Sequence, residues 1–317
     1  DAKARNISVY IYDQDYTKAG SPKVQGVNEM NYPSGLKYLY GKQMYLLLVD
    51  DGTGMDKDEM REALVYGRRR KYEDYELGHF GVGLKNSTMS QAYEATIISK
   101  KDNEINIVRI SSVHIQSKQE DQLLEADDLE NLYPWMSNTE GYKMALDELG
   151  ELDSGTAILL EGLHKIERDI GAGTGRQEYI DSIIKRLRSQ IGLTFNRYIS
   201  GKYKIKRTNG KSKEIKAIRM SINSDPIHPL DPFFTEFTDN ETNHWTLNRP
   251  LPALTKVGDE INVLEGKAYI IPKQSELKTK SKAKNVMDKL MFVREELAWY
   301  DLQGIYLFRH QRLIDYA

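Results

Sequence analysis

Three glycines recur within a short stretch of the chain, Gly78, Gly81 and Gly83, in the sequence GHFGVGLKNS. Glycine lets a backbone take positive φ and approach a ligand more closely than a side chain would permit. Residues 84–92 are predicted to continue as a helix, whose first-turn N–H groups attract an anion, and Lys85 adds a positive charge. The pattern therefore predicts a polyphosphate site made of Gly78, His79, Phe80, Gly81, Val82, Gly83, Leu84 and Lys85.

Three better-known glycine-rich loops do not fit this stretch. The Walker loop needs lysine directly after glycine, and Leu84 separates Gly83 from Lys85. The dinucleotide fingerprint needs a glycine where Asn86 stands, and a protein-kinase loop needs later signatures that the chain lacks. Taken alone, the stretch also fits a tight turn that binds nothing.

A second motif lies upstream, where the apolar run 45–49 predicts a buried strand that ends at Asp50. Two glycines follow, in the order Asp51-Gly52-Thr53-Gly54. A carboxylate at such a strand end can accept a hydrogen bond from an amino group lying flat over the turn, and purine exocyclic amines are such donors. The predicted base-binding residues are Asp50, Gly52, Gly54 and Met55, and the alternative is an ordinary acidic turn.

The order of these motifs, Asp-x-Gly-x-Gly at 50–54, then a helix, a basic segment and Gly-x-x-Gly-x-Gly at 78–83, resembles that of the GHKL ATPases. These include gyrase, heat-shock chaperones, histidine kinases and MutL. The continuation at 83–90 is most similar to the MORC branch and its bacterial relatives. The stretch 304–314 resembles a strand-turn of MORC- and MutL-like second domains. The resemblance implies a Bergerat-fold protein that binds ATP and Mg²⁺.

For the fold, the resemblance implies α+β architecture. A two-layer α/β sandwich would form the ATPase domain over 1–165, and a ribosomal-S-five-like α+β transducer domain would follow over 166–317. Glycines at 171–175 punctuate the chain near this boundary.

For the site, the resemblance implies that Thr156, which enters a buried strand, lies beneath the adenine. It also implies that a lysine of the second domain, Lys273 or Lys278, reaches the γ-phosphate as a catalytic residue. Asp1-Ala2 resembles the tail of a helical box that carries a glutamate and an asparagine. The glutamate that orients water and the asparagine that binds magnesium are therefore expected upstream of residue 1, and no metal ligand is predicted within the chain.

Several elements must position these motifs. Residues 56–66 predict a helix, because Asp56 is a suitable N-cap and Glu59 completes a capping box. The charged segment 68–77 is predicted to be a lid that a bound triphosphate orders. Residues 93–110 predict a hairpin that turns around Lys101-Asp102-Asn103. The other predicted elements are strands at 7–12, 154–160, 218–222 and 267–271 and a long helix around 180–191.

Composition narrows the class of protein. The chain has 317 residues with 39% apolar and 29% charged residues, and no apolar run approaches the ~20 residues that span a bilayer. It has no cysteine, which fits a reducing compartment, so we expect a cytoplasmic protein that does not enter a membrane. A net charge of −2 gives no bulk reason for nucleic-acid binding, but basic clusters at 68–71, 202–207 and 278–284 leave DNA contact open.

By resemblance, the predicted function is ATP binding with slow ATP hydrolysis, in a clamp gated by nucleotide and closed as an ATP-dependent homodimer. Such a clamp would act in DNA transactions or defence. The alternative is a nucleotide-dependent chaperone or interaction scaffold with little hydrolysis. A histidine kinase is disfavoured, because the chain continues well beyond the nucleotide domain.

Overall fold

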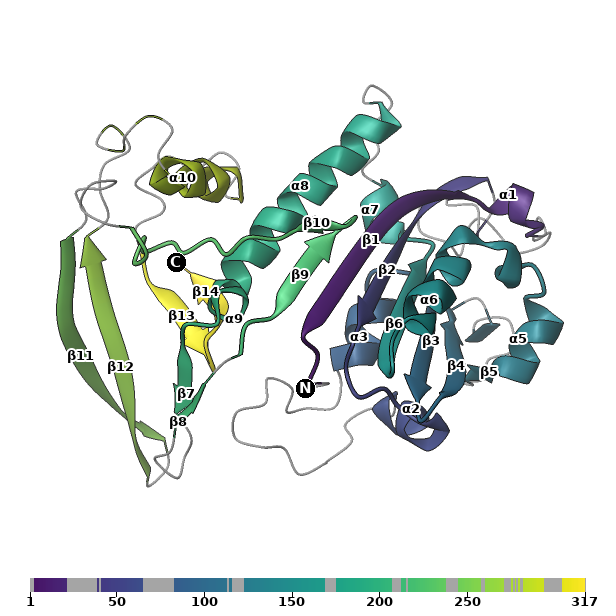
Figure 1. Ribbon diagram of the computed structural model, residues 1–317, viewed down its shortest axis with the longest axis horizontal. Coiled ribbons are helices and arrows are strands. Elements are labelled where there is room, and N and C mark those ends of the chain that lie inside the picture. The colour runs from purple at the N-terminus through teal and green to yellow at the C-terminus, as the bar shows by residue number, and fades with distance from the viewer. Residues whose placement is uncertain are drawn as a thin grey trace. The chain divides into compact units, whose positions relative to one another are not determined.

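The computed structural model in Figure 1 describes residues 3–21, 39, 41–64, 83–112, 114–115, 123–168, 175–206, 212–214, 216–237, 245–257, 260–270, 275, 277, 279, 282–293 and 304–316. The chain divides into two compact units that alternate along the sequence. Residues 1–185 and 201–227 form the first, and 186–200 and 228–317 form the second. The two-domain division at 165/166 stays a prediction.

The first unit is built on an eight-stranded sheet with the order β10-β9-β1-β2-β6-β3-β4-β5. All neighbouring strands are antiparallel except β1 and β9, which run parallel. The strands are β1 Asn6–Asp15, β2 Lys42–Asp50, β3 Glu94–Lys101, β4 Glu104–Ser111, β5 Leu124–Glu125, β6 Gly155–Glu161, β9 Arg219–Ile222 and β10 Asp225–Pro226. A separate hairpin pairs β7 Lys204–Lys206 with β8 Ser212–Glu214.

Helices pack on both faces of this sheet. Gly141 of α6 lies so close to β6 that an added Cβ would come within 2.8 Å of Leu159 Cδ1. Successive strand residues point to opposite faces, so Ile158 points away from α6 and packs in the cluster that α2 and α3 cover. The helices are α1 Tyr16–Ala19, α2 Lys57–Ala63, α3 Gly83–Met89, α5 Ala126–Leu132, the 3-10 helix η2 Met136–Asn138, α6 Glu140–Gly150, α7 His164–Arg168 and α8 Arg176–Thr194, which continues into the second unit.

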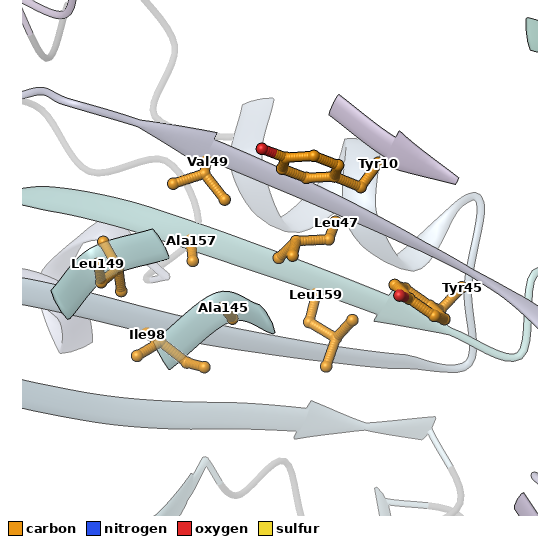
Figure 2. Packing of buried hydrophobic residues seen from close by; sticks show 9 residues of the cluster. All are labelled: Tyr10, Tyr45, Leu47, Val49, Ile98, Ala145, Leu149, Ala157 and Leu159. Carbon is orange, nitrogen blue, oxygen red and sulfur yellow. The ribbon is translucent and has the colours of Figure 1, made fainter. Parts of the chain in front are cut away.

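One core cluster of the first unit lies between α6 and the central strands. Figure 2 shows nine buried side chains from β1, β2, β3, β6 and α6 that pack together there. The predicted α+β fold is thus confirmed, and α6 adds a layer to the predicted two-layer sandwich. Within the described residues, no helix is both long and apolar enough to span a membrane.

A tight turn joins β3 to β4. Asp102 and Asn103 both have positive φ, of 51° and 64°, the backbone that a two-residue type I′ hairpin turn needs. Asn and Asp tolerate this backbone better than most residues, because their short polar side chains can bond locally. The predicted hairpin at 93–110 is therefore present, with its turn where the sequence places it.

The second unit contains α9 Asn196–Ser200, β11 Trp245–Val257, β12 Glu260–Ile270, α10 Lys282–Val293, β13 Tyr306–Arg309 and β14 Arg312–Tyr316. Its core combines residues of α8, α10 and β14 with the segment 228–237. The sequence predicted a strand only at 267–271, whereas β12 is longer and pairs with β11. Lys282 and Lys284, the last lysines of the basic cluster 278–284, lie in the first turn of α10. The assignment of this unit as a transducer domain stays a prediction.

Candidate functional site

Polar side chains from three neighbouring strands form a row at one end of the sheet. Asp50 of β2 lies opposite Thr156 of β6, and Thr156 lies opposite Ser99 of β3. Residues that pair directly across antiparallel strands point to the same face, with Cβ atoms about 5 Å apart. The strand alternation turns this row toward the face that α2 and α3 cover.

Only one of the two carboxylate oxygens of Asp50 has a hydrogen-bond partner among the described residues. The carboxylate is half-buried, and its Oδ1 accepts a hydrogen bond from the Gly52 N–H at 2.8 Å. Its Oδ2 has no hydrogen-bond partner among the described residues. Burial raises the pKa of Asp50, the Gly52 N–H lowers it, and the neighbouring Asp51 charge raises it again, with a net upward shift. Such a carboxylate favours a ligand that brings a donor.

Two glycines bring the turn after Asp50 into direct contact with β3 and β6. Gly54 has φ of +64°, and an added Cβ would lie 1.9 Å from the Lys100 carbonyl oxygen. At Gly155, an added Cβ would lie 2.3 Å from the carbonyl oxygen of Asp50. Both contacts are with backbone, which cannot move aside, so only glycine fits at either position.

Hydrogen bonds hold the same turn at both ends. The Ser154 hydroxyl donates to the carbonyl oxygen of Gly52 at 2.7 Å. The N–H of Met55 donates to the hydroxyl oxygen of Ser99 at 2.8 Å. These two hydrogen bonds therefore fix the position of the turn relative to the ends of β3 and β6 without a ligand.

Ser99 is a site residue that sequence reasoning missed. It ends the run Thr96-Ile97-Ile98-Ser99, and a polar residue at the end of an apolar strand does not by itself indicate a site. Its hydroxyl lies 2.9 Å from Thr156 Oγ1 and 3.0 Å from the Gly155 carbonyl oxygen. Only the pairing of β3 with β6 reveals this position, and that pairing is not readable from local sequence.

Asp51, although adjacent, has a different role. Its carboxylate accepts hydrogen bonds from the backbone N–H of Arg5 at 2.6 Å and of Asn6 at 2.8 Å, and from the Asn6 side-chain amide. Burial by itself would raise the pKa of Asp51, but these donors outweigh it and lower the pKa below its ordinary value. Asp51 thus fastens the start of β1 to the end of β2.

The helix after the turn begins as predicted. Asp56 is the N-cap of α2 and forms both bonds of a capping box with Glu59. Lys101 adds ion pairs to the two acids, at 3.0 and 2.6 Å. The helix ends at Ala63, and the N–H of its C-cap Leu64 bonds to carbonyl oxygens of the last turn; residues 65 and 66 of the predicted helix lie outside the described residues.

The second motif is described only from its last glycine onward. Gly83 begins α3, which ends at Met89 rather than at residue 92. Leu84 of α3 and Met55 of the turn pack against one buried cluster, so the two motifs lie over the same part of the sheet. Lys85 is half-buried in the first turn of α3. Gly78, His79, Phe80, Gly81 and Val82 lie outside the described residues, as do the predicted lid 68–77 and the candidate catalytic residues Lys273 and Lys278.

The described part of this site offers hydrogen-bond acceptors and no cluster of metal ligands. Among the described residues, no group of three or more His, Asp or Glu side chains is arranged to hold a metal. The row of Asp50, Thr156 and Ser99 instead offers oxygen acceptors beside a closely packed turn, which suits a flat ligand with an amino group.

Parts of the chain are similar to known proteins. Residues 1–141 match the profile of the family described as histidine kinase-, DNA gyrase B-, and HSP90-like ATPase. A 69-residue stretch is 35% identical to ATPase morc-1 of Caenorhabditis elegans and covers 22% of this chain and 8% of that protein. A 55-residue stretch is 38% identical to Protein MICRORCHIDIA 6 of Arabidopsis thaliana and covers 17% of this chain and 8% of that protein. The matches thus span less than a tenth of either relative.

One solved structure that aligns with the chain is the ATPase region of Saccharomyces cerevisiae topoisomerase II. The alignment covers 72% of this chain and 44% of that one, with 9% identity and a TM-score of 0.33. A score this low supports no argument about the fold or the site.

Proposed function

We propose that this protein, whose residues 1–141 belong to the histidine kinase-, DNA gyrase B- and HSP90-like ATPase family, binds ATP with the adenine over the turn after Asp50. One observation carries the proposal. The half-buried Asp50 carboxylate keeps one oxygen without a partner among the described residues, beside Thr156. The 6-amino group of adenine would donate to that oxygen, and the turn held by Gly54 would support the ring from below.

The phosphates belong, in this proposal, at the glycine stretch 78–83 and Lys85. Support comes from the cluster beneath both motifs, against which Met55 and Leu84 pack. Because the base turn and the start of α3 share this support, one extended ligand can contact both. A nucleotide triphosphate has the required two ends, a flat base with an amino group and a chain of anionic phosphates.

The proposed reaction is slow hydrolysis of the bound ATP. Phosphoryl transfer to water depends on positioning and on neutralising the charge of the phosphates, to which Lys85 and the loop amides would contribute. Magnesium, when bound, would neutralise further phosphate charge. Lys273 or Lys278 is proposed to contact the γ-phosphate and so to report whether ATP or ADP is bound.

At the level of the whole protein, we place this chemistry in a homodimeric clamp that ATP closes and that acts in DNA transactions or defence. One relative carries the name of an ATPase, and the chain matches only a small part of it. The alternative is a nucleotide-dependent chaperone or scaffold with little hydrolysis. DNA binding that ATP strengthens and salt weakens would separate the clamp from the chaperone.

Calorimetry with ATP, ADP and a non-hydrolysable ATP analogue, each with magnesium, tests the proposal directly. We expect saturable ATP binding, tighter binding of the analogue with dimer formation seen by light scattering, and slow phosphate release. Asp50→Asn should weaken ATP binding about tenfold to a hundredfold, since a hydrogen bond to a charged acceptor is lost.

Asp102→Asn is the matched control. It makes the same chemical change in the exposed turn between β3 and β4, where Asn accepts the positive φ as well as Asp does. Its ATP affinity should equal that of the unmodified protein. If the Asp50 and Asp102 variants bind ATP with equal affinity, Asp50 does not bind the base. If the unmodified protein does not bind ATP, the proposed function is wrong.

A further inference from the structure

The hydroxyl of Ser99 lies at the centre of the polar row and has three neighbours. The side chain is fully buried. Its oxygen lies 2.8 Å from the Met55 nitrogen, 3.0 Å from the Gly155 carbonyl oxygen and 2.9 Å from Thr156 Oγ1. These neighbours come from the base turn and from β6, so this one side chain contacts both parts of the proposed base site.

The chemistry of these neighbours decides the direction of each hydrogen bond. A hydroxyl has one hydrogen to donate and two lone pairs that accept. The Met55 N–H can only donate, and the Gly155 carbonyl can only accept, so the hydrogen of Ser99 points to Gly155. The remaining contact is a hydrogen bond only if Thr156 donates to Ser99. In that arrangement every donor and acceptor of the Ser99 hydroxyl is used, as a buried group requires.

This direction determines what Thr156 can offer a ligand. Thr156 retains 7% of its surface exposed, so it is the member of the pair that can meet a bound molecule. With its hydrogen held by Ser99, the Thr156 hydroxyl presents only lone pairs. Asp50, beside it in the row, also presents an acceptor, its Oδ2, which has no partner among the described residues. The row therefore accepts hydrogen bonds and donates none.

We infer that Ser99 is a positioning residue that sets base specificity, because it holds Thr156 as an acceptor and holds Met55 at the end of the base turn. The inference rests on the proposed function, in which the adenine lies over this turn. A row without donors accepts the 6-amino group of adenine. It disfavours a purine with oxygen at position 6, since that oxygen would face two acceptors without a hydrogen between them.

Inosine triphosphate is the sharpest probe, because it differs from ATP by replacing the 6-amino group with a 6-oxo group, which also places a hydrogen on N1. Affinities for ATP and inosine triphosphate would be measured by calorimetry on the unmodified protein, Ser99→Ala and Ser99→Thr. We expect the unmodified protein to prefer ATP at least tenfold. In Ser99→Ala, Thr156 is free to rotate and donate to the 6-oxo group, so the preference should fall at least fivefold. Ser99→Thr keeps the hydroxyl and should retain the preference.

Two further variants keep the test decisive. Ser111→Ala removes another fully buried strand-end serine, remote from the row, and should leave the ATP preference unchanged. If Ser99→Ala does not fold, Ser99→Cys provides the comparison, because a thiol has similar shape and is a weak hydrogen-bonding group. An equal loss of affinity for both nucleotides in the Ser99 variant would overturn the specificity role and leave the base site intact. Failure of the unmodified protein to bind either nucleotide would remove the base site and the inference together.

Discussion

Two groups of polar side chains lie at opposite ends of β3 and β6, and they differ in how completely they are partnered. The row at one end contains Ser99, Thr156 and Asp50, and the Oδ2 of Asp50 has no hydrogen-bond partner in the described part of the chain. At the other end, Glu94 of β3 lies opposite Glu161 of β6. Strand alternation places these glutamates on the opposite face of the sheet from the row. The same two strands therefore carry one polar group that is open and one that is closed.

The closed group centres on Arg109 of β4, whose side chain is fully buried. Its Nε donates to Glu94 at 2.9 Å, and its Nη1 donates to Glu161 at 2.7 Å. The remaining carboxylate oxygens accept from hydroxyl groups, Glu94 from Ser111 at 2.7 Å and Glu161 from Tyr16 at 3.0 Å. Every oxygen of both carboxylates thus has a donor.

The difference separates two uses of polar groups in one sheet. A buried carboxylate destabilises the fold unless partners compensate its charge, so in a structural group each carboxylate oxygen has a partner from within the chain. A binding site must keep an acceptor available, and it carries the cost of desolvation until a ligand arrives. By this criterion Arg109 with its two glutamates is structural, and Asp50 with Thr156 fits the base site that we propose.

Breaking the closed group should have the largest effect on stability. Arg109→Met removes the guanidinium and leaves Glu94 and Glu161 buried without it, so the free energy of unfolding should fall by about 3–5 kcal/mol. Denaturant unfolding followed by circular dichroism measures this change. Arg61→Met is the control, because Arg61 makes its ion pairs on the surface and should cost about 1 kcal/mol or less. A loss below 1 kcal/mol for Arg109→Met would contradict the structural role.

Asp51 offers a smaller test within the turn itself. Its folded-state pKa is lowered, so its contribution to stability is fully present above the unfolded-state pKa of about 4 and is lost as the pH falls further. Asp51→Asn should therefore lower the free energy of unfolding at pH 7 by about 1 kcal/mol, as hydrogen bonds to Arg5 and Asn6 weaken. The difference from the unmodified protein should shrink toward pH 3. Thermal unfolding at both pH values checks this, and a constant difference would exclude the carboxylate as its cause.

The sequence predicts well those features that depend on neighbouring residues. The strand that ends at Asp50, the capping box of Asp56 and the hairpin turn at Asp102 are all set by local patterns, and all are present. Gly54, predicted from the motif as a base-binding residue, also lies close to the Lys100 carbonyl oxygen, a contact that the sequence did not predict.

Features that depend on distant pairing could not be predicted. Nothing local indicates that β9 joins the first sheet beside β1, because their paired residues are more than two hundred positions apart. The role of Ser99 arises only from its register with Thr156. Arg109 and its glutamates likewise read as polar strand positions, since their burial depends on α1, α5 and η2 covering that face. The position of a polar residue in a strand does not reveal whether segments elsewhere in the chain will bury it.

The smallest expected effect on stability is a gain rather than a loss, and it contrasts Asp50 with Asp51 directly. Burial raises the folded-state pKa of Asp50, so its ionised form costs stability at pH values above the unfolded-state pKa of about 3.9. Asp50→Asn should remove this cost and slightly raise the midpoint of thermal unfolding at pH 7 in the absence of nucleotide. The gain should disappear near pH 3, where Asp50 is protonated in both states. Asn keeps an oxygen that accepts the Gly52 N–H, so loss of this hydrogen bond should not mask the gain in stability. A lower midpoint at pH 7 would mean that Asp50, like Asp51, stabilises the turn and is not held open for a ligand.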